Sequence, residues 1–230
     1  MFMPFWDPTF IVLIPAVLLA LYAQFRVKSA YAQYSQVPVS SGLTGAQAAE
    51  EILRRNGLSN VTVDRTEGVL SDHYDPRTRA LSLSADVYSG ASVAAVGVAA
   101  HETGHAIQHA RGYAPLALRS AMVPTVQFGS WLAWPIFILG FLFHSGGMVQ
   151  LGILIFSALV AFTVVTLPVE FDASARAMRA LQEERLVTPD ELRGVRSVLT
   201  AAALTYVAAA AMSVMQLLRM LMLANMRRRD

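Results

Sequence analysis

The sequence predicts a mainly α-helical membrane protein with about four transmembrane helices and a small α+β domain. Of the 230 residues, 55% are hydrophobic and only 15% are charged, which is too apolar for an ordinary soluble domain. The apolar residues also cluster in segments close to the roughly 20 residues that cross a bilayer as a helix. Between them lie polar segments with helix and strand patterns. The four apolar segments are residues 9–25, 121–143, 148–168 and 198–218.

The first apolar segment predicts a retained anchor rather than a cleaved signal peptide. No Lys or Arg precedes it, and no small-residue cleavage site follows it in "YAQFRVKSAYAQY". The second and third segments are separated only by the loop "HSGG". The predicted organisation is an N-terminal transmembrane anchor (1–25), a cytosolic domain (26–120), two transmembrane helices (121–168), a second cytosolic segment (169–197) and a C-terminal transmembrane helix with its tail (198–230).

Loop charges predict the orientation in the membrane. Residues 26–120 carry nine Lys or Arg and residues 169–197 carry five, whereas the N-terminal tail and "HSGG" carry none. By the positive-inside rule both charged segments face the cytoplasm and the N-terminus lies outside. One feature disagrees, because a fully spanning fourth helix would place the basic C-terminal "NMRRRD" outside. The side of the membrane on which this tail lies therefore stays open.

The two cytosolic segments are expected to meet and form one small α+β domain. Residues 44–57 have a helix pattern with Thr44 as N-cap and Gly57 as the stop signal. Residues 60–66 and 79–85 alternate apolar and polar side chains and predict short strands around a polar, turn-like stretch. A further helix is expected to begin near residues 89–96. The chain has no cysteine, which excludes disulfides and thiolate zinc sites, and no basic stripe of the kind that binds nucleic acid.

The stretch "HETGH" in this last helix predicts a metal site. In a helix, His101 and His105 lie one turn apart on the same face and can share one ion. Glu102 lies about 100° around the helix, where its carboxylate can act on a water molecule beside the metal without being a ligand. Two imidazoles and a carboxylate favour Zn²⁺. His109 is not expected to be a ligand, because eight residues of straight helix span about 12 Å. The pattern that recruits a third histidine has glycine where this chain has Gln108.

The third ligand must then come from another segment, and it is expected at the acidic start of residues 169–197. Glu170 is favoured over Asp172 because it shares a helix face with Ser174 and Ala177, whose small side chains allow close packing. Asp172 is about equally well explained as an acid at the positive end of a helix that starts there.

The chain resembles the YugP family of bacterial membrane zinc metallopeptidases, within the gluzincin class. The shared stretches are "LTGAQAAEEILRRNGL", "SDHYDPRTR", "LSADVYSGASVAAVGVAAHETGHAIQHA" and "PVEFDASARA". The resemblance implies a zincin-like domain with His101, His105 and Glu170 as zinc ligands and Glu102 as catalytic acid/base. It also implies the inner membrane of a bacterial cell. HtpX-like relatives of the class have an Asp four residues after the ligand Glu, where this chain has Ser174, so Ser174 and Asp172 are both candidates for orienting a ligand histidine.

The implied reaction is peptide hydrolysis, in which the metal polarises the scissile carbonyl and Glu102 moves the proton of the attacking water. His73, Tyr74 and Arg176 are the candidates for stabilising the oxyanion. The strand-like "ALSLSAD" (80–86) is a further hypothesis, as a strand that pairs with an extended substrate.

Two other functions stay open. An intramembrane protease is disfavoured because the Asn-Pro-Asp-Gly and Leu-Asp-Gly elements are absent and "SADVYSGAS" is polar. The other is a non-catalytic membrane adaptor or chaperone with a structural metal. The expected partners are a peptide or membrane-protein substrate, the lipid bilayer and a membrane protein partner or second copy, with no nucleic acid. No residue indicates which substrate is cleaved.

Overall fold

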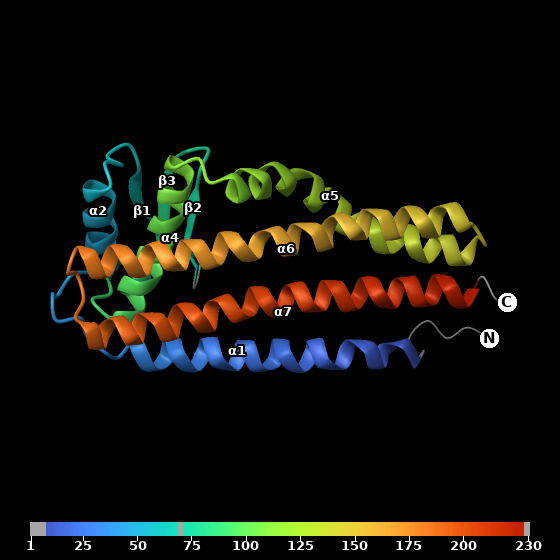
Figure 1. Ribbon diagram of the computed structural model, residues 1–230, viewed down its shortest axis with the longest axis horizontal. Coiled ribbons are helices and arrows are strands. Elements are labelled where there is room, and N and C mark those ends of the chain that lie inside the picture. Colours follow the sequence, from blue (N-terminus) through green and yellow to red (C-terminus); the bar gives the residue numbers. More distant parts are fainter. Residues whose placement is uncertain (1–7, 69–70, 228–230) are drawn as a thin grey trace. The chain divides into compact units, whose positions relative to one another are not determined.

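The computed structural model describes residues 8–68 and 71–227, and its helices and strands are labelled in Figure 1. By its contacts the chain divides into two compact units. We call residues 8–23, 118–167 and 205–227 the apolar unit, and residues 24–68, 71–117 and 168–204 the polar unit. The elements are η1 Pro8–Leu13, α1 Ile14–Tyr34, α2 Gly45–Arg55, β1 Thr62–Thr66, β2 His73–Asp75, β3 Ala80–Ser84, α3 Ala85–Ser89, α4 Val93–Ala110, α5 Ala114–Leu142, α6 Gly146–Glu183 and α7 Pro189–Arg227.

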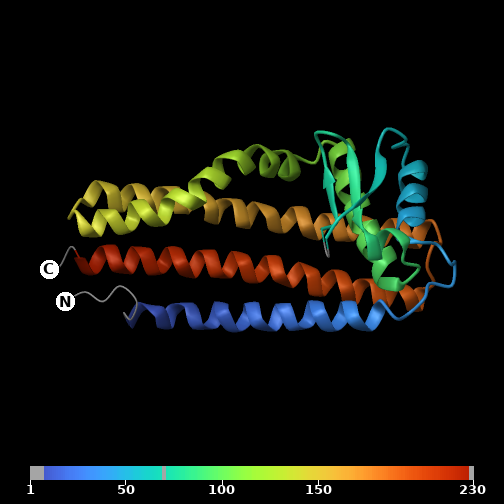
Figure 2. The same cartoon turned by 180° about the vertical axis from the view of Figure 1, so that it is seen from behind.

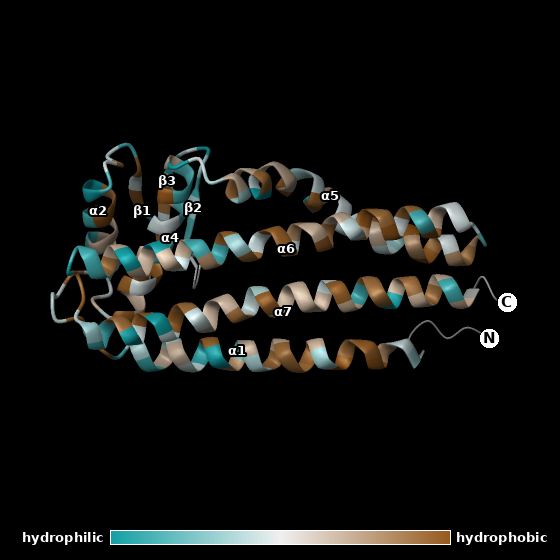
Figure 3. Cartoon of the chain, in the orientation of Figure 1, coloured by the Kyte–Doolittle hydropathy of each residue, from teal (hydrophilic) through white to brown (hydrophobic). Residues whose placement is uncertain are grey.

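The predicted fold class is confirmed. Four helical stretches are long and apolar enough to cross a membrane by length and composition, namely Pro8–Tyr34, Ala114–Leu142, Gly146–Glu183 and Pro189–Met226. Figure 3 shows apolar residues concentrated along α5 and the first part of α6. The predicted C-terminal tail extends beyond the described residues, as does the start of the predicted N-terminal anchor.

Close helix packing in the apolar unit depends on glycines of the α5–α6 hairpin. A Cβ added at Gly140 would lie 2.6 Å from the backbone nitrogen of Val149, and one at Gly152 would lie 2.8 Å from the Cβ of Phe137. Small residues of this kind let helix backbones approach each other in a membrane protein. Large apolar side chains face outward, with Trp131 83% exposed. Such a surface is stable when lipid covers it.

In the polar unit, α2 begins and ends as its sequence predicts. Thr44 accepts a hydrogen bond from the backbone of Gln47, and the Gln47 side chain accepts one from the backbone of Thr44, which makes a complete capping box. Gly57 follows the helix with a φ of +72°, the left-handed conformation that suits glycine.

We expect Thr44→Ala to lower the free energy of unfolding of the polar unit by about 1 kcal/mol, because the N-terminal amide loses its acceptor. The measurement is thermal unfolding of the detergent-solubilised protein. Thr44→Ser keeps the hydroxyl and is the control. Equal melting temperatures for the alanine and serine variants would contradict the assigned cap.

The three strands form one sheet in the order β1-β3-β2, with β1 parallel and β2 antiparallel to β3. Both expected strands are present. The polar stretch between them was expected to be turn-like, but it also contains the short strand β2. This polar strand of three residues is stabilised by pairing with β3, a tertiary contact that leaves no periodic pattern in sequence. The hypothesis that residues 80–86 pair with an extended substrate was wrong, since both edges of β3 are already paired.

The helix that carries the histidines, α4, lies at the centre of the polar unit. Ser92 caps it by accepting from the backbone of Ala95 at 3.2 Å. One side of α4 packs against α2, β3 and α3, and the strands lie beside it in Figure 2. Another side packs against the last part of α6 and the first part of α7 through a buried cluster. The cluster includes Val93, Val96, Ala100, Ile107, Ala177, Leu181, Val195 and Leu199.

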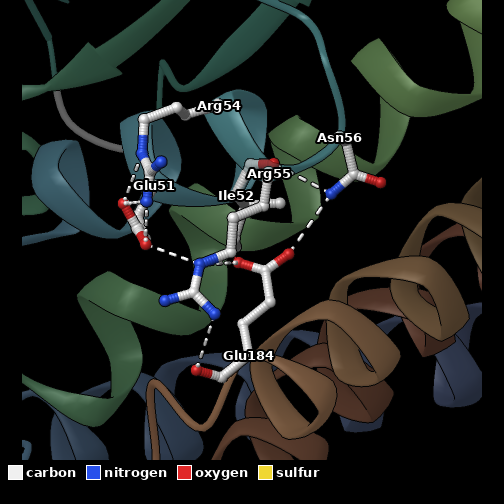
Figure 4. A network of polar contacts seen from close by, with 6 residues as sticks. All are labelled: Glu51, Ile52, Arg54, Arg55, Asn56 and Glu184. Carbon is white, nitrogen blue, oxygen red and sulfur yellow. Dashed lines mark hydrogen bonds and ion pairs between the residues drawn. The ribbon is translucent and has the colours of Figure 1, made fainter.

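A polar network joins the C-terminal ends of α2 and α6 (Figure 4). Arg55 lies between Glu51, at 2.5 Å, and Glu184, at 3.8 Å. The Asn56 amide donates to the side chain of Glu184 at 3.3 Å. Hydrogen bonds from Arg54 and Arg55 hold the pKa of Glu51 at about 2. Because the side chains of Arg54 and Arg55 are exposed, we assign the network a role in orienting the two helix ends rather than a large stability contribution.

Candidate metal centre

His101 and His105 lie on one face of α4, as the i, i+4 spacing predicts. Their ring centroids are 4.9 Å apart and the ring planes are nearly perpendicular, at 84°. His105 is 7% exposed, whereas His101 is partly exposed. The pair therefore lies at the edge of the polar unit's core, with one imidazole reachable from solvent.

A carboxylate from α6 faces both imidazoles. The Oε2 atom of Glu170 lies 3.2 Å from Nε2 of His101 and 3.7 Å from Nε2 of His105. Glu170 is only 2% exposed. Among the described residues, His101, His105 and Glu170 form the group of ligand-type side chains that could hold a metal ion, with donor atoms within 4.8 Å of one another.

These distances suit Zn²⁺. Zinc binds nitrogen and carboxylate oxygen at about 2.0–2.1 Å, so two ligand atoms at a tetrahedral angle are about 3.4 Å apart. The two nitrogen–oxygen separations, 3.2 and 3.7 Å, lie on either side of this value. Three protein donors also leave a fourth tetrahedral position for water or substrate, as in catalytic zinc sites.

The electrostatics of the group also favour a cation. Burial alone would raise the pKa of Glu170, but hydrogen bonds with the two imidazoles dominate and hold this pKa well below its usual range. Burial lowers the pKa of His105, yet the Glu170 and Glu102 carboxylates more than offset this effect and raise it. The buried carboxylate needs a positive charge beside it. A divalent metal supplies that charge while leaving both imidazoles neutral.

A glycine inside the motif permits the approach of α6. A Cβ added at Gly104 would lie 2.4 Å from the backbone oxygen of Ala173, which is one turn from Glu170 on α6. No side chain larger than hydrogen fits there while the two helix backbones keep this distance. Gly104 therefore allows the Glu170 carboxylate to reach the histidine pair.

We expect Gly104→Ala to push α6 away from α4, with a loss of about 1–3 kcal/mol in the free energy of unfolding and at least about tenfold weaker zinc binding. Melting temperature and competition with a fluorescent chelator measure the two effects. The matched control is Gly147→Ala, since a Cβ at Gly147 has no neighbour within 4 Å. Wild-type zinc affinity in Gly104→Ala would show that the close approach is not needed.

The other nitrogen of each histidine has its own partner. Nδ1 of His101 lies 3.1 Å from the hydroxyl of Ser174, and Nδ1 of His105 lies 3.0 Å from Oε1 of Gln108. Asp172 accepts a hydrogen bond from the Gln108 amide at 2.8 Å. Both candidates for orienting a histidine are thus at the site, Ser174 directly and Asp172 through Gln108. The alternative for Asp172, an acid at a helix start, was wrong, because α6 runs unbroken from Gly146 to Glu183.

The three candidates for stabilising the oxyanion, Arg176, His73 and Tyr74, each have a polar contact of their own. Arg176 donates to Asp172 at 2.6 Å, and its guanidinium lies over the ring of Tyr113. His73 is exposed, and its Nδ1 lies 2.8 Å from the backbone oxygen of Ser71.

The hydroxyl of Tyr74 lies 2.8 Å from Nδ1 of His109, one turn beyond His105 on α4. Glu102, the expected acid/base, is partly buried.

Gln108 is the residue that sequence reasoning missed. It is fully buried, at 0% exposure, in a helix face that also carries His105. The available signal was a polar side chain three residues after a proposed ligand, on the same face of the helix. In the sequence, Gln108 was notable only as the position where another histidine pattern has glycine.

The fold and the site together define the class of protein: a helical protein with candidate membrane spans and a His-His-Glu group that could hold a metal ion. The chain belongs to a family of zinc metallopeptidases, since the family model described as "Putative neutral zinc metallopeptidase" matches residues 9–225. The protein of Bacillus subtilis (strain 168) named "Putative membrane protease YugP" is 49% identical over 210 residues, covering 91% of this chain and 93% of that protein. No solved structure matches the chain. The family resemblance drawn from the motifs is confirmed.

Proposed function

We propose that this protein is a membrane-embedded, zinc-dependent endopeptidase. Its zinc ion is held by Nε2 of His101, Nε2 of His105 and the carboxylate of Glu170, and Glu102 is the general acid/base. The observation that carries the proposal is the pair of nitrogen–oxygen separations, 3.2 and 3.7 Å, around a buried carboxylate. Family membership supports zinc and peptide hydrolysis at the level of the class.

When bound, zinc supplies Lewis acidity, which lowers the pKa of water and polarises a carbonyl. Glu102 follows His101 in α4, so its side chain flanks the donor face rather than joining it. From there the Glu102 carboxylate accepts a proton from the attacking water and later delivers it to the leaving amine. We propose that substrate enters beside His101, because this imidazole is partly exposed whereas that of His105 is buried.

The oxyanion donor is proposed to be Tyr74 rather than Arg176 or His73. The Tyr74 hydroxyl contacts Nδ1 of His109, which follows His105 on the same face of α4. With His109 protonated on Nδ1, the hydroxyl accepts that hydrogen bond and its own proton is left for an oxyanion. The Arg176 guanidinium is oriented by its ion pair with Asp172 and lies over the ring of Tyr113, and His73 is exposed with its ring against the backbone of Ser71. A phenol hydroxyl can donate a hydrogen bond to a developing oxyanion.

We further propose a multi-pass protein in the inner membrane of a bacterial cell, with the active site facing the cytoplasm and a peptide or membrane protein as substrate. The excess of Lys and Arg in residues 26–120 and 169–197 supports this orientation. An intramembrane protease is disfavoured, since α4, which carries the histidines, is not among the four candidate spans.

The central experiment measures zinc content and proteolysis on purified protein in detergent. We expect about one zinc per chain, cleavage of an unfolded polypeptide, loss of cleavage with a zinc chelator and recovery on adding Zn²⁺. Zinc bound without cleavage of any unfolded or membrane-protein substrate would favour the adaptor. No zinc bound would contradict the proposed metal site.

Orientation is testable because the native sequence has no cysteine. Single cysteines at Gln182, at the exposed end of α6, and at Gly146, after the second apolar segment, would be labelled in intact cells with a membrane-impermeant maleimide. We expect Gln182→Cys to be protected and Gly146→Cys to be labelled. The reverse pattern would contradict a cytoplasmic active site.

A further inference from the structure

The partners of the Gln108 side chain determine which way its amide points. Its Nε2 atom lies 2.8 Å from the backbone oxygen of Val169 and 2.8 Å from Oδ2 of Asp172. A backbone carbonyl and a carboxylate can only accept hydrogen bonds, so the NH₂ group must face them. The amide oxygen is therefore the atom that faces His105, at 3.0 Å from Nδ1.

This orientation determines the tautomer of His105. An amide oxygen can only accept, so Nδ1 of His105 must carry the proton. In the neutral imidazole the lone pair is then on Nε2, the nitrogen that faces Glu170. The hydroxyl of Ser174 beside His101 can donate or accept, so that contact leaves the tautomer of His101 undetermined.

We propose that Gln108 is a positioning residue that holds His105 in the Nδ1-protonated tautomer and thereby presents Nε2 to the metal. This inference rests on the metal site of the proposed function. Gln108 itself has three hydrogen-bond partners, of which His105 is one. Asp172 and Val169 on α6 accept its two amide protons, and its side chain is fully buried. Asp172 is in turn held by Arg176 at 2.6 Å.

The same contacts couple the metal site to helix packing. Gln108 and His105 are on α4, whereas Val169, Asp172 and the Glu170 between them are on α6. The Gln108 amide thus binds α6 on both sides of Glu170 along the sequence. The Gln108 side chain therefore orients the imidazole of His105 and also binds the segment of α6 that carries Glu170.

The first test uses the wild-type protein. Nitrogen-15 NMR of histidine-labelled, metal-free protein at alkaline pH distinguishes the two neutral tautomers, and His105→Asn identifies the His105 signal among the five histidines. We expect the proton of His105 on Nδ1. A proton on Nε2 would overturn the proposal, even if zinc binding had not yet been measured.

The second test compares Gln108→Met, which keeps the size but loses both hydrogen-bonding functions, with Gln108→Glu, which keeps an acceptor for His105. We expect Gln108→Met to lose the tautomer preference and to bind zinc about 10–100-fold more weakly. Gln108→Glu should keep the Nδ1-protonated tautomer and bind zinc more tightly than Gln108→Met. It should nevertheless be less stable than wild type, because its carboxylate faces two acceptors.

The matched control is Thr103→Val, another fully buried polar residue of α4, whose hydroxyl bonds only to the backbone of Ala99 in the contacts described. It should keep wild-type zinc affinity. Equal losses of affinity in Thr103→Val and Gln108→Met would overturn the positioning role and assign Gln108 to packing alone. A wild-type protein that binds no zinc would contradict the proposed function, whereas zinc binding unaffected by Gln108→Met would contradict only this inference.

Discussion

Glu170→Gln is expected to abolish stoichiometric zinc binding, with an affinity loss of more than about 100-fold. Mutation of a hydrogen-bond partner of a zinc ligand typically lowers zinc affinity about 10–100-fold, and loss of a ligand itself should lower it further. The neutral amide no longer offers a negative oxygen to the ion at the position that faces both imidazoles. Zinc content of the purified variant and competition with a chelator measure the effect.

A second measurement separates lost metal binding from a misfolded protein. Zinc at 100 times its dissociation constant stabilises a folded protein by about 2.7 kcal/mol, so added Zn²⁺ should raise the melting temperature of the wild type but not of Glu170→Gln. The matched control is Glu183→Gln, the same change at an exposed position of α6. A zinc-dependent rise in Glu170→Gln equal to that of the wild type would remove Glu170 from the proposed ligand set.

Glu102→Gln is expected to keep zinc and lose proteolysis. General acid–base groups contribute about 100- to 10,000-fold to rates, and the amide cannot accept the proton of the attacking water. Because Glu102 lies on the flank of α4 outside the His-His-Glu group, its neutralisation should leave the donor atoms in place. Zinc content and the cleavage rate of an unfolded polypeptide are compared in the same preparation.

The control for this change is Glu50→Gln, an exposed glutamate of α2, which should cleave at the wild-type rate. Full activity in Glu102→Gln would assign the acid/base to another group. Loss of zinc together with activity would indicate that Glu102 supports the metal site itself. Trapping with an inactive, zinc-loaded Glu102→Gln protein in native membranes would then identify the bound substrates.

Long periodic segments could be predicted from sequence because their signal is local. The four apolar helices each contain a continuous apolar run, and the cap of α2 is Thr44, directly before the helix that it starts. The i, i+4 spacing likewise places His101 and His105 on one face without any knowledge of the rest of the chain. Such features depend on residues within a few positions of one another.

Features that depend on distant pairing were less predictable. The strand β2 has three residues and no alternating pattern, and it is extended because it pairs with β3. The unbroken course of α6 through Pro168 was missed as well, and with it the position of Asp172 inside a helix rather than at its start. The polar partner Gln108 is recognisable only once α6 lies against α4.

By itself, the sequence determined the membrane-type helices, the paired histidines of α4 and the short list of acids from which a third donor could come. Only the tertiary structure decided that Glu170 is the acid facing both imidazoles, while Asp172 binds Gln108. The physical reason is the close contact at Gly104, where the absence of a side chain brings the backbone of α6 against α4. Which carboxylate then points at the histidines depends on how two helices cross, and that geometry depends on packing between residues about 70 positions apart.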